Sequence, residues 1–165
     1  MVGTAQGCVR VQLIRSHPHL TCGGFDLPAM QPLFSHYVEA HSLSDRLRFT
    51  PGDFFTDDLP HADVLIMGMI LHDWDLSTKQ MLIRKAYDAL KRGGTLIIYE
   101  LLIDDARKTS VPGLLMSFNM LIETKGGFDF TGADCIGRTR MPVLPTVAWC
   151  RLPVLTARSS AESRA

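Results

Sequence analysis

Two continuous apolar runs constrain the fold more than any other feature of this sequence. Residues 62–71 (ADVLIMGMIL) and 95–103 (TLIIYELLI) lack the alternation of a half-exposed strand, and both are too short to cross a membrane as helices. Runs of this kind are typical of strands buried on both faces of a sheet. Between them, residues 76–94 have helical periodicity, with Ser77 or Thr78 expected to cap the start and Gly93-Gly94 to end the helix.

The rest of the first 125 residues continues this alternation of short strands and longer helices. We expect helices over residues 5–16 and 28–43, and strands over 21–27 and 47–55. Parallel strands joined by crossover helices follow from that order, so the predicted class is α/β with a doubly wound, mostly parallel sheet. Ligands of such sheets bind beyond the carboxyl ends of the strands, which is where chemistry is sought below.

Composition restricts the partners and the compartment. The chain has 165 residues, 46% of them hydrophobic, and 17 basic residues balance 17 acidic ones. This balance argues against recognition of nucleic acid or an anionic membrane by charge. The start has no basic flank followed by an apolar stretch, and the four cysteines (Cys8, Cys22, Cys135, Cys150) form no CxxC pair. These features favour a cytoplasmic protein with reduced, structural thiols.

The pattern changes near residue 136. We interpret residues 1–135 as one domain and residues 136–165 as an irregular or disordered tail, because three prolines and several arginines replace any sustained period. The abruptness of the change suggests a shift of reading frame, which only the nucleotide sequence would test.

A glycine turn opens the first helix. Gly3 and Gly7 in VGTAQG let the backbone turn tightly and approach a ligand, and the free N–H groups of a helix start favour polar or anionic groups. Asp26 ends the next strand about 20 residues later, where an acid binds the ribose in nucleotide-binding units. The alternative for Asp26 is a cap on the following helix, and we favour the ribose role.

Asp53 follows the strand after that, in PGDFF. It could accept a hydrogen bond from an adenine amino group, with Phe54 or Phe55 packing on the ring. A turn aspartate beside two core phenylalanines explains the bare spacing better.

The segment LHDWD, residues 71–75, is the most informative. His72 comes directly after a buried strand and therefore lies at the expected cleft, where a near-neutral pKa lets it take a proton from a hydroxyl. Asp73 or Asp75 would orient the ring or cap the next helix. A histidine with only a structural role is an equally good interpretation from the sequence.

Three further carboxylates follow. Glu100 closes the next strand and could hold the histidine or a substrate hydroxyl. Glu123 and Asp129 lie near GGFDFT, where a solvated position is the usual one for a carboxylate.

Taken together and in this order, these motifs resemble the S-adenosylmethionine-dependent O-methyltransferases that act on plant phenylpropanoids, hydroxyindoles and bacterial polyketides. The resemblance covers residues 2–135 through VGTAQG, GFDLP, GDFF, LHDW, GGTLIIYE, NMLIET and GGFDFT. The combination that is most specific to this family is LHDW followed by a helix that ends in GG and a strand that ends in Glu.

The resemblance implies a cofactor, a base and an acceptor pocket. S-adenosyl-L-methionine is the implied cofactor, with His72 as base and Glu100 and Asp129 as its flanking carboxylates. The implied cofactor-binding residues are Gly3 and Gly7 (methionine part), Asp26 (ribose), Asp53 with Phe54 (adenine), and Met67 with Gly68 (near the sulfonium). Met116, Asn119 and Met120 fall on the helix that lines the pocket of a small hydroxylated acceptor. No metal is implied, and the sequence has no evident ligand cluster.

Relatives of this type also carry an N-terminal helical region that builds a homodimer and closes the acceptor pocket, and a strand before the glycine turn. The sequence does not contain the region and begins at Met1-Val2, so we expect a sheet incomplete at both ends. Two alternatives to methyl transfer therefore remain: a truncated remnant, inactive or serving as an interaction module, and a nicotinamide-dependent oxidoreductase. VGTAQG departs from GxGxxG, and LHDW has no evident role in hydride transfer, which disfavours the oxidoreductase.

Overall fold

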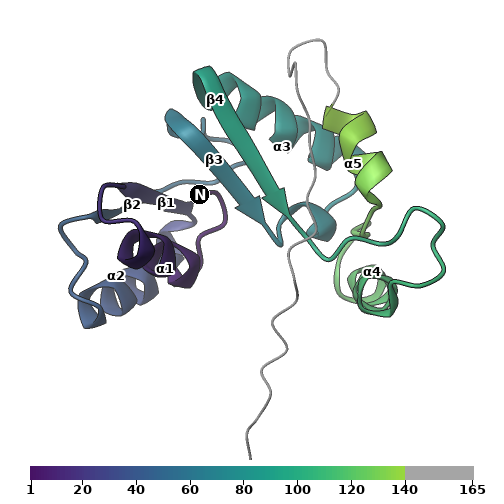
Figure 1. Ribbon diagram of the computed structural model, residues 1–165, viewed down its shortest axis with the longest axis horizontal. Helices are drawn as coiled ribbons and strands as arrows, with labels where there is room; N and C mark the ends of the chain where they lie inside the picture. The colour runs from purple at the N-terminus through teal and green to yellow at the C-terminus, as the bar shows by residue number, and fades with distance from the viewer. Residues whose placement is uncertain (140–165) are drawn as a thin grey trace, which may run out of the picture.

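The computed structural model describes residues 1–139, which form four parallel-paired strands and five α-helices (Figure 1). Strands and helices alternate along the chain except that β3 follows β2 and α5 follows α4. The strands are β1 (Cys22–Asp26), β2 (Leu47–Pro51), β3 (Ala62–Gly68) and β4 (Leu90–Tyr99). The helices are α1 (Cys8–Ser16), α2 (Gln31–Ala40), α3 (Leu76–Ala89), α4 (Val111–Glu123) and α5 (Gly132–Thr139), with 3₁₀ turns η1 (Pro28–Met30) and η2 (Leu71–Asp73). The predicted α/β class is confirmed.

Residues 1–3 join two parallel strand pairs. β1 pairs with β2, and β3 pairs with β4. Val2 forms parallel bridges to Phe25 of β1 and Met67 of β3, and its N–H donates to the carbonyl of Ile66 at 2.9 Å. The spatial order is therefore β2, β1, residues 1–3, β3, β4, with all neighbours parallel, so the carboxyl ends meet at one edge.

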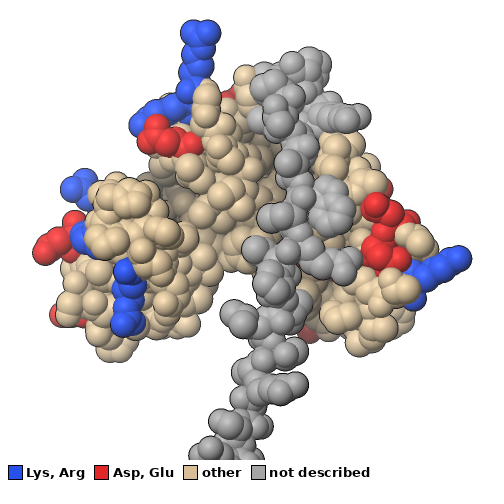
Figure 2. Space-filling view, viewed as in Figure 1, with Lys and Arg blue, Asp and Glu red and all other residues tan. Residues whose placement is uncertain are grey.

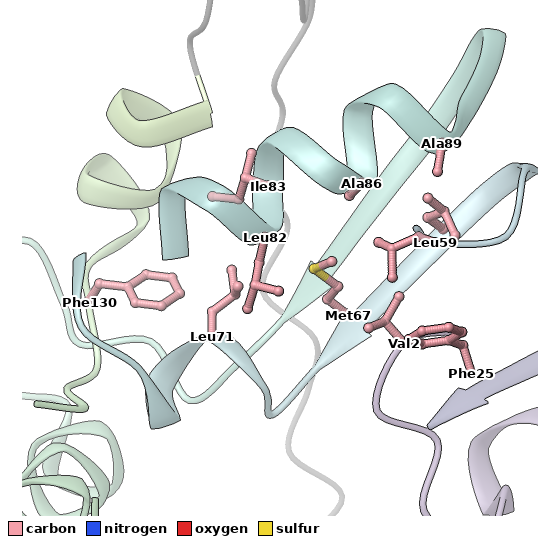
Figure 3. Packing of buried hydrophobic residues seen from close by; sticks show 11 residues of the cluster. Val2, Phe25, Leu59, Met67, Leu71, Leu82, Ile83, Ala86, Ala89 and Phe130 are labelled. Carbon is pink, nitrogen blue, oxygen red and sulfur yellow. The ribbon is translucent and has the colours of Figure 1, made fainter. Parts of the chain in front are cut away.

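The main core lies between α3 and the β3–β4 pair. Leu82, Ile83, Ala86 and Ala89 recur at helical spacing on one face of α3 and pack over Met67 (Figure 3). Val2 lies between Phe25 and Met67 in the same cluster and is fully buried (Figure 3). A second cluster unites α1, α2 and β2 through five buried residues: Val11, Ile14, Phe34, Val38 and Leu47.

The predicted boundary between α3 and β4 is wrong. α3 ends at Ala89, and Gly93 and Gly94 lie inside β4, which ends at Tyr99 and not at residue 103. The pairing shifts register between Ala62 and Val64, so a bulge on β4 accommodates Gly93 with its φ of 82°. The two glycines therefore serve a bulge in a strand and do not end a helix.

Several other boundaries differ from the sequence prediction. The cap of α3 is Asp75, whose carboxylate accepts the N–H of Thr78 at 2.8 Å; this confirms one of the predicted alternatives, and the expected cap at Ser77 or Thr78 is wrong. The first helix begins at Cys8 because residues 5–7 form the turn. Residues 136–139, expected to be irregular, belong to α5, and the remainder of the predicted tail lies outside the described residues.

Charged side chains of both signs lie at the edges of the face shown in Figure 2, and neither sign gathers into an extended patch there. Among the described residues, no helix is both long and apolar enough to span a membrane. Three cysteines, Cys8, Cys22 and Cys135, are free thiols.

The bridging role of Val2 predicts a large local effect on stability. Val2→Ala should lower the free energy of unfolding by about 1–3 kcal/mol, because it removes two fully buried methyl groups where the strand pairs meet. Val64→Ala, on the 47% exposed side chain of β3, is the matched control and should cost less than about 0.5 kcal/mol. Urea unfolding measures both, and equal effects would contradict the placement of Val2 in the core.

Candidate functional site

A cavity of about 580 Å³ opens at the carboxyl ends of the strands. Its wall is formed by the glycine turn, by Asp26 after β1, by Asp53 and Phe54 after β2, and by Gly68 after β3. The volume suits a ligand of the size of a nucleoside-type cofactor. Of the residues proposed from sequence to bind the cofactor, six line this cavity: Gly3, Gly7, Asp26, Asp53, Phe54 and Gly68.

The glycine turn holds Asp26 at the cavity wall. Gly3 has φ of 63°, and a Cβ there would clash with the side chain of Ile70, so glycine is strongly favoured at this position. The N–H groups of Ala5 and Leu27 donate to the two carboxylate oxygens of Asp26, each at 2.8 Å. The carboxylate of Asp26 is thus fixed to the glycine turn, and η1, the next element, has no side-chain cap within the described part of the chain.

Aromatic side chains form the wall beyond β2. Phe54, Phe55 and Trp74 pack on one another with ring centroids 4.8–5.8 Å apart, and all three line the cavity. Asp53 lies beside them with its Oδ1 accepting the N–H of Phe55 at 2.8 Å. Asp53 therefore shapes a turn, as the sequence suggested, and also faces the cavity. Trp74 was not proposed from sequence, and its place in LHDW was the signal that could have found it.

The segment after β3 is turned toward the cavity. Met67, predicted to lie near the sulfonium, is fully buried in the core and is not among the residues that line the cavity. Met69 lines the cavity instead, with a left-handed φ of 53°. This conformation is energetically unfavourable for a non-glycine residue, and residues strained in this way are concentrated at functional sites. A Cβ on Gly68 would clash with the ring of Tyr99, which lies directly against its backbone.

His72 lies beside this cavity against two buried carboxylates. Its Nδ1 is 3.4 Å from Oδ1 of Asp129 and 3.8 Å from Oε2 of Glu100, and both carboxylate side chains are fully buried. The second ring nitrogen, Nε2, is 3.5 Å from Oδ1 of Asp73, which lines the cavity. Asp129, for which a solvated position is usual, is buried and lies beside His72, where the resemblance placed it.

Backbone geometry fixes Glu100. The N–H groups of Ile70 and Leu71 donate to Oε1 of Glu100 at 3.1 and 2.9 Å, so the end of β4 is tied to the turn that carries His72. The other oxygen, Oε2, faces Nδ1 of His72 and has no hydrogen-bond partner among the described residues. Oε2 therefore interacts electrostatically with the imidazole of His72.

Charge and burial shift the pKa values of this cluster. Burial raises the pKa of Glu100 to about 7, against the opposing effects of His72 and of the two N–H donors. The interaction with Asp129, helped by the charges of Glu100 and Asp73, raises the pKa of His72 above its usual 6.5, although burial opposes the rise. The separation of 3.4 Å is long for a hydrogen bond, and such contacts commonly tighten when a ligand binds.

The same three side chains could also hold a metal ion. One ligand atom each from His72, Glu100 and Asp129 lie within 4.8 Å of one another. The premise that the chain has no ligand cluster is therefore wrong, because residues 28 and 29 positions apart in sequence give no spacing signal. The motif HPH gives no such cluster, and its two histidine rings meet edge to face at 6.0 Å.

The predicted acceptor residues lie on α4, which packs against η2. Met120 is buried, Met116 is half-buried and Asn119 is exposed, and none of the three lines the cavity. Ser117, on the same helix, accepts the N–H of Asp129 at 3.1 Å and was not proposed from sequence. The outer face of α4 exposes five large apolar residues: Val111, Leu115, Phe118, Leu121 and Ile122.

A known protein family matches the part of the chain that contains the cavity and the His72 cluster. The O-methyltransferase domain family matches residues 1–131. Similar proteins include the tetracenomycin polyketide synthesis 8-O-methyl transferase TcmO of Streptomyces glaucescens, 42% identical over 82% of this chain and 40% of TcmO. The N,N-dimethyltransferase OxyT of Streptomyces rimosus is 38% identical over 72% of this chain and 34% of OxyT. The chain thus spans about 40% or less of the length of these relatives.

A solved structure supports the same assignment of the fold. Human N-acetylserotonin methyltransferase in complex with SAM superposes with a TM-score of 0.76 and 28% identity, over 84% of this chain and 39% of the human chain.

The buried cluster predicts that stability falls as pH rises. A folded-state pKa of about 7 for Glu100, against an ordinary 4.5, means that the folded chain binds this proton more tightly than the unfolded chain. Its contribution is complete below the ordinary value and is lost as pH rises through about 7, and the raised pKa of His72 acts in the same direction. Between about pH 5 and about pH 8 the loss should be on the order of 1–3 kcal/mol.

Glu100→Gln isolates this effect, because the amide keeps an acceptor for Ile70 and Leu71 but cannot ionise. Its free energy of unfolding should change less between the two pH values than that of the wild type. The exposed Glu123→Gln is the matched control and should follow the wild type. Equal pH dependence in all three proteins would show that Glu100 is ionised in the folded chain without penalty.

Proposed function

The chain belongs to the O-methyltransferase domain family, and from that premise we propose that it transfers a methyl group from S-adenosylmethionine to a hydroxyl of a small aromatic acceptor. We propose His72 as the general base. The observation that carries the proposal is the position of His72, with Nδ1 against two fully buried carboxylates and Nε2 on the side of Asp73, which lines the cavity.

The cavity residues fit the cofactor by chemistry and by space. The carboxylate of Asp26 offers acceptors for ribose hydroxyls, and Asp53 with Phe54 offers an acceptor and an apolar surface for adenine. The turn at Gly3 and Gly7 brings backbone close to the cavity and precedes the N-terminus of α1, which suits the methionine end. When bound, S-adenosylmethionine supplies an electrophilic methyl group on a sulfonium sulfur.

The protein supplies the base and its orientation. A neutral imidazole that carries its proton on Nδ1, facing Asp129 and Glu100, presents an unprotonated Nε2 to the acceptor hydroxyl. Nε2 takes that proton, and the two carboxylates stabilise the imidazolium that results. Glu100 and Asp129 act through His72 and are therefore positioning residues, as is Ser117 through the N–H of Asp129.

The acceptor helix remains part of the proposal. Met116, Asn119 and Met120 lie on α4 next to η2, and we propose that they border the acceptor. The relative named as an N,N-dimethyltransferase makes an amine acceptor the second candidate, because a neutral base beside a methyl donor serves either atom. Neither chemistry requires a metal, so turnover should survive treatment with EDTA.

Labelled S-adenosylmethionine and a panel of acceptors test the function directly. The panel holds a polycyclic phenol, a hydroxyindole and an aromatic amine, and transfer to either hydroxylated compound supports the proposal. Transfer only to the amine supports the second candidate. Binding of S-adenosylhomocysteine without transfer to any acceptor would favour an inactive binding module.

The base role predicts a defined pH profile. kcat should rise with pH through a midpoint above 6.5, because only neutral His72 accepts a proton and its pKa is raised. Asp129→Asn removes the largest cause of that rise, so its midpoint should move to lower pH. His72→Gln should reduce kcat by about 10²–10⁴ with little change in cofactor affinity.

His36→Gln, at an exposed position on α2, is the control and should behave as the wild type. Turnover by His72→Gln within about threefold of the wild type would remove the general base from the mechanism and leave positioning alone as the source of rate.

A further inference from the structure

Lys79 on α3 is a buried lysine held by two carbonyl groups. Its side chain is 1% exposed, and its Nζ donates to the carbonyl of Trp74 at 2.6 Å and to the carbonyl of Phe128 at 2.8 Å. The same Nζ lies 3.3 Å from the centroid of the Phe128 ring, which adds a cation–π contact. One ammonium group therefore satisfies its donors on two separate segments of the chain.

These two segments carry the base and its partner. Trp74 follows His72 by two residues, and Phe128 directly precedes Asp129. The segments are in close contact, since a Cβ on Gly127 would clash with the backbone oxygens of His72 and Asp73. Lys79 thus bridges the turn that carries His72 and the segment that carries Asp129.

Stability alone does not account for a lysine at this position. Leu71, Ile83 and Phe130 line one small apolar space together with Lys79, so an apolar residue would pack there without the cost of burying an ammonium. A buried ammonium that donates to two backbone carbonyls instead gives directional control of the segments that it contacts.

We propose that Lys79 is a positioning residue that holds Asp129 against Nδ1 of His72 and thereby sets the tautomer of the base. The proposal rests on the proposed function of His72. Nζ of Lys79 donates to backbone carbonyls next to His72 and next to Asp129, so Lys79 acts through the backbone on both sides.

The same helix offers a matched control. Lys85 donates through Nζ to the carbonyls of Phe54 at 2.8 Å and Asp57 at 2.7 Å, and so ties α3 to the turn that contains Asp53. Lys79 and Lys85 thus have the same chemistry on one helix, but the second lysine holds the proposed adenine side of the cavity and not the base.

Long-range ¹H–¹⁵N NMR of histidine-labelled protein reports the tautomer of His72 in the full chain. Wild-type His72 should carry its neutral-state proton on Nδ1, and Lys79→Met should move that proton toward Nε2, the form that free imidazole side chains favour. Lys85→Met should keep the wild-type tautomer and weaken binding of S-adenosylhomocysteine. kcat should fall about tenfold or more in Lys79→Met, and Lys79→Arg, which keeps donors for both carbonyls, should recover most of it.

A wild-type tautomer in folded Lys79→Met would overturn the proposal. Should that variant not fold, Lys79→Gln, which keeps a neutral donor, is read by the same criterion. A Nε2–H tautomer in the wild type itself would instead contradict the proposed orientation of the base, whatever the lysine variants do. The two failures are therefore distinguishable.

Discussion

The rest of this site depends on the burial of two carboxylates around one imidazole nitrogen. Glu100 and Asp129 are fully buried, and Nδ1 of His72 lies within 3.8 Å of an oxygen of each. Buried acids without a positive partner would be costly, so the cluster favours a proton or a cation among them. The raised pKa values of Glu100 and His72 express this constraint, and the proposed chemistry uses it to stabilise an imidazolium.

The fold produces the cluster by bringing together segments that are distant in sequence. β3 leads through the left-handed Met69 into η2, and the N–H groups of that turn hold Glu100 at the end of β4. Parallel pairing of β3 with β4 places these two strand ends side by side. Asp129 arrives from a later segment, which Ser117 of α4 and Lys79 of α3 hold in place. Each of these hydrogen bonds joins residues at least 12 positions apart, so the cluster depends on the tertiary fold.

The sequence predicts the parts of the structure that depend on local pattern. The apolar run over 62–71, the amphipathic period of α3 and the order of strands and helices are enough for the α/β class and for the cleft at the strand ends. The expected burial of these strands on both faces is wrong, because Val64 of β3 is 47% exposed and Ile97 of β4 is 43% exposed. The end of α3 was predicted wrongly because glycines that stop a helix also suit a bulge, and only the partner strand decides between them. Met67 lies in the core, whereas Gly68 and Met69 line the cavity, because the chain leaves β3 at this point and the sequence alone does not show where the strand ends.

Contacts between segments distant in sequence could not be predicted from residue types and local spacing. Asp129 entered only through a resemblance, and its burial depends on packing against η2 that no local pattern encodes. Lys79 gave no signal at all, because a lysine in an amphipathic helix is ordinarily on the solvated face. Its two carbonyl partners lie 5 and 49 residues away, and only the structure brings them together.

The central claim is that the cavity at the strand ends is an S-adenosylmethionine site. Calorimetric titration of the chain with S-adenosylhomocysteine, with NAD in parallel, tests it most directly. The account predicts saturable binding with a stoichiometry of about one for S-adenosylhomocysteine and none for NAD, because the turn, Asp26 and the aromatic wall together fit the first ligand. Binding of NAD alone, or of neither ligand by a chain that unfolds cooperatively, would contradict it.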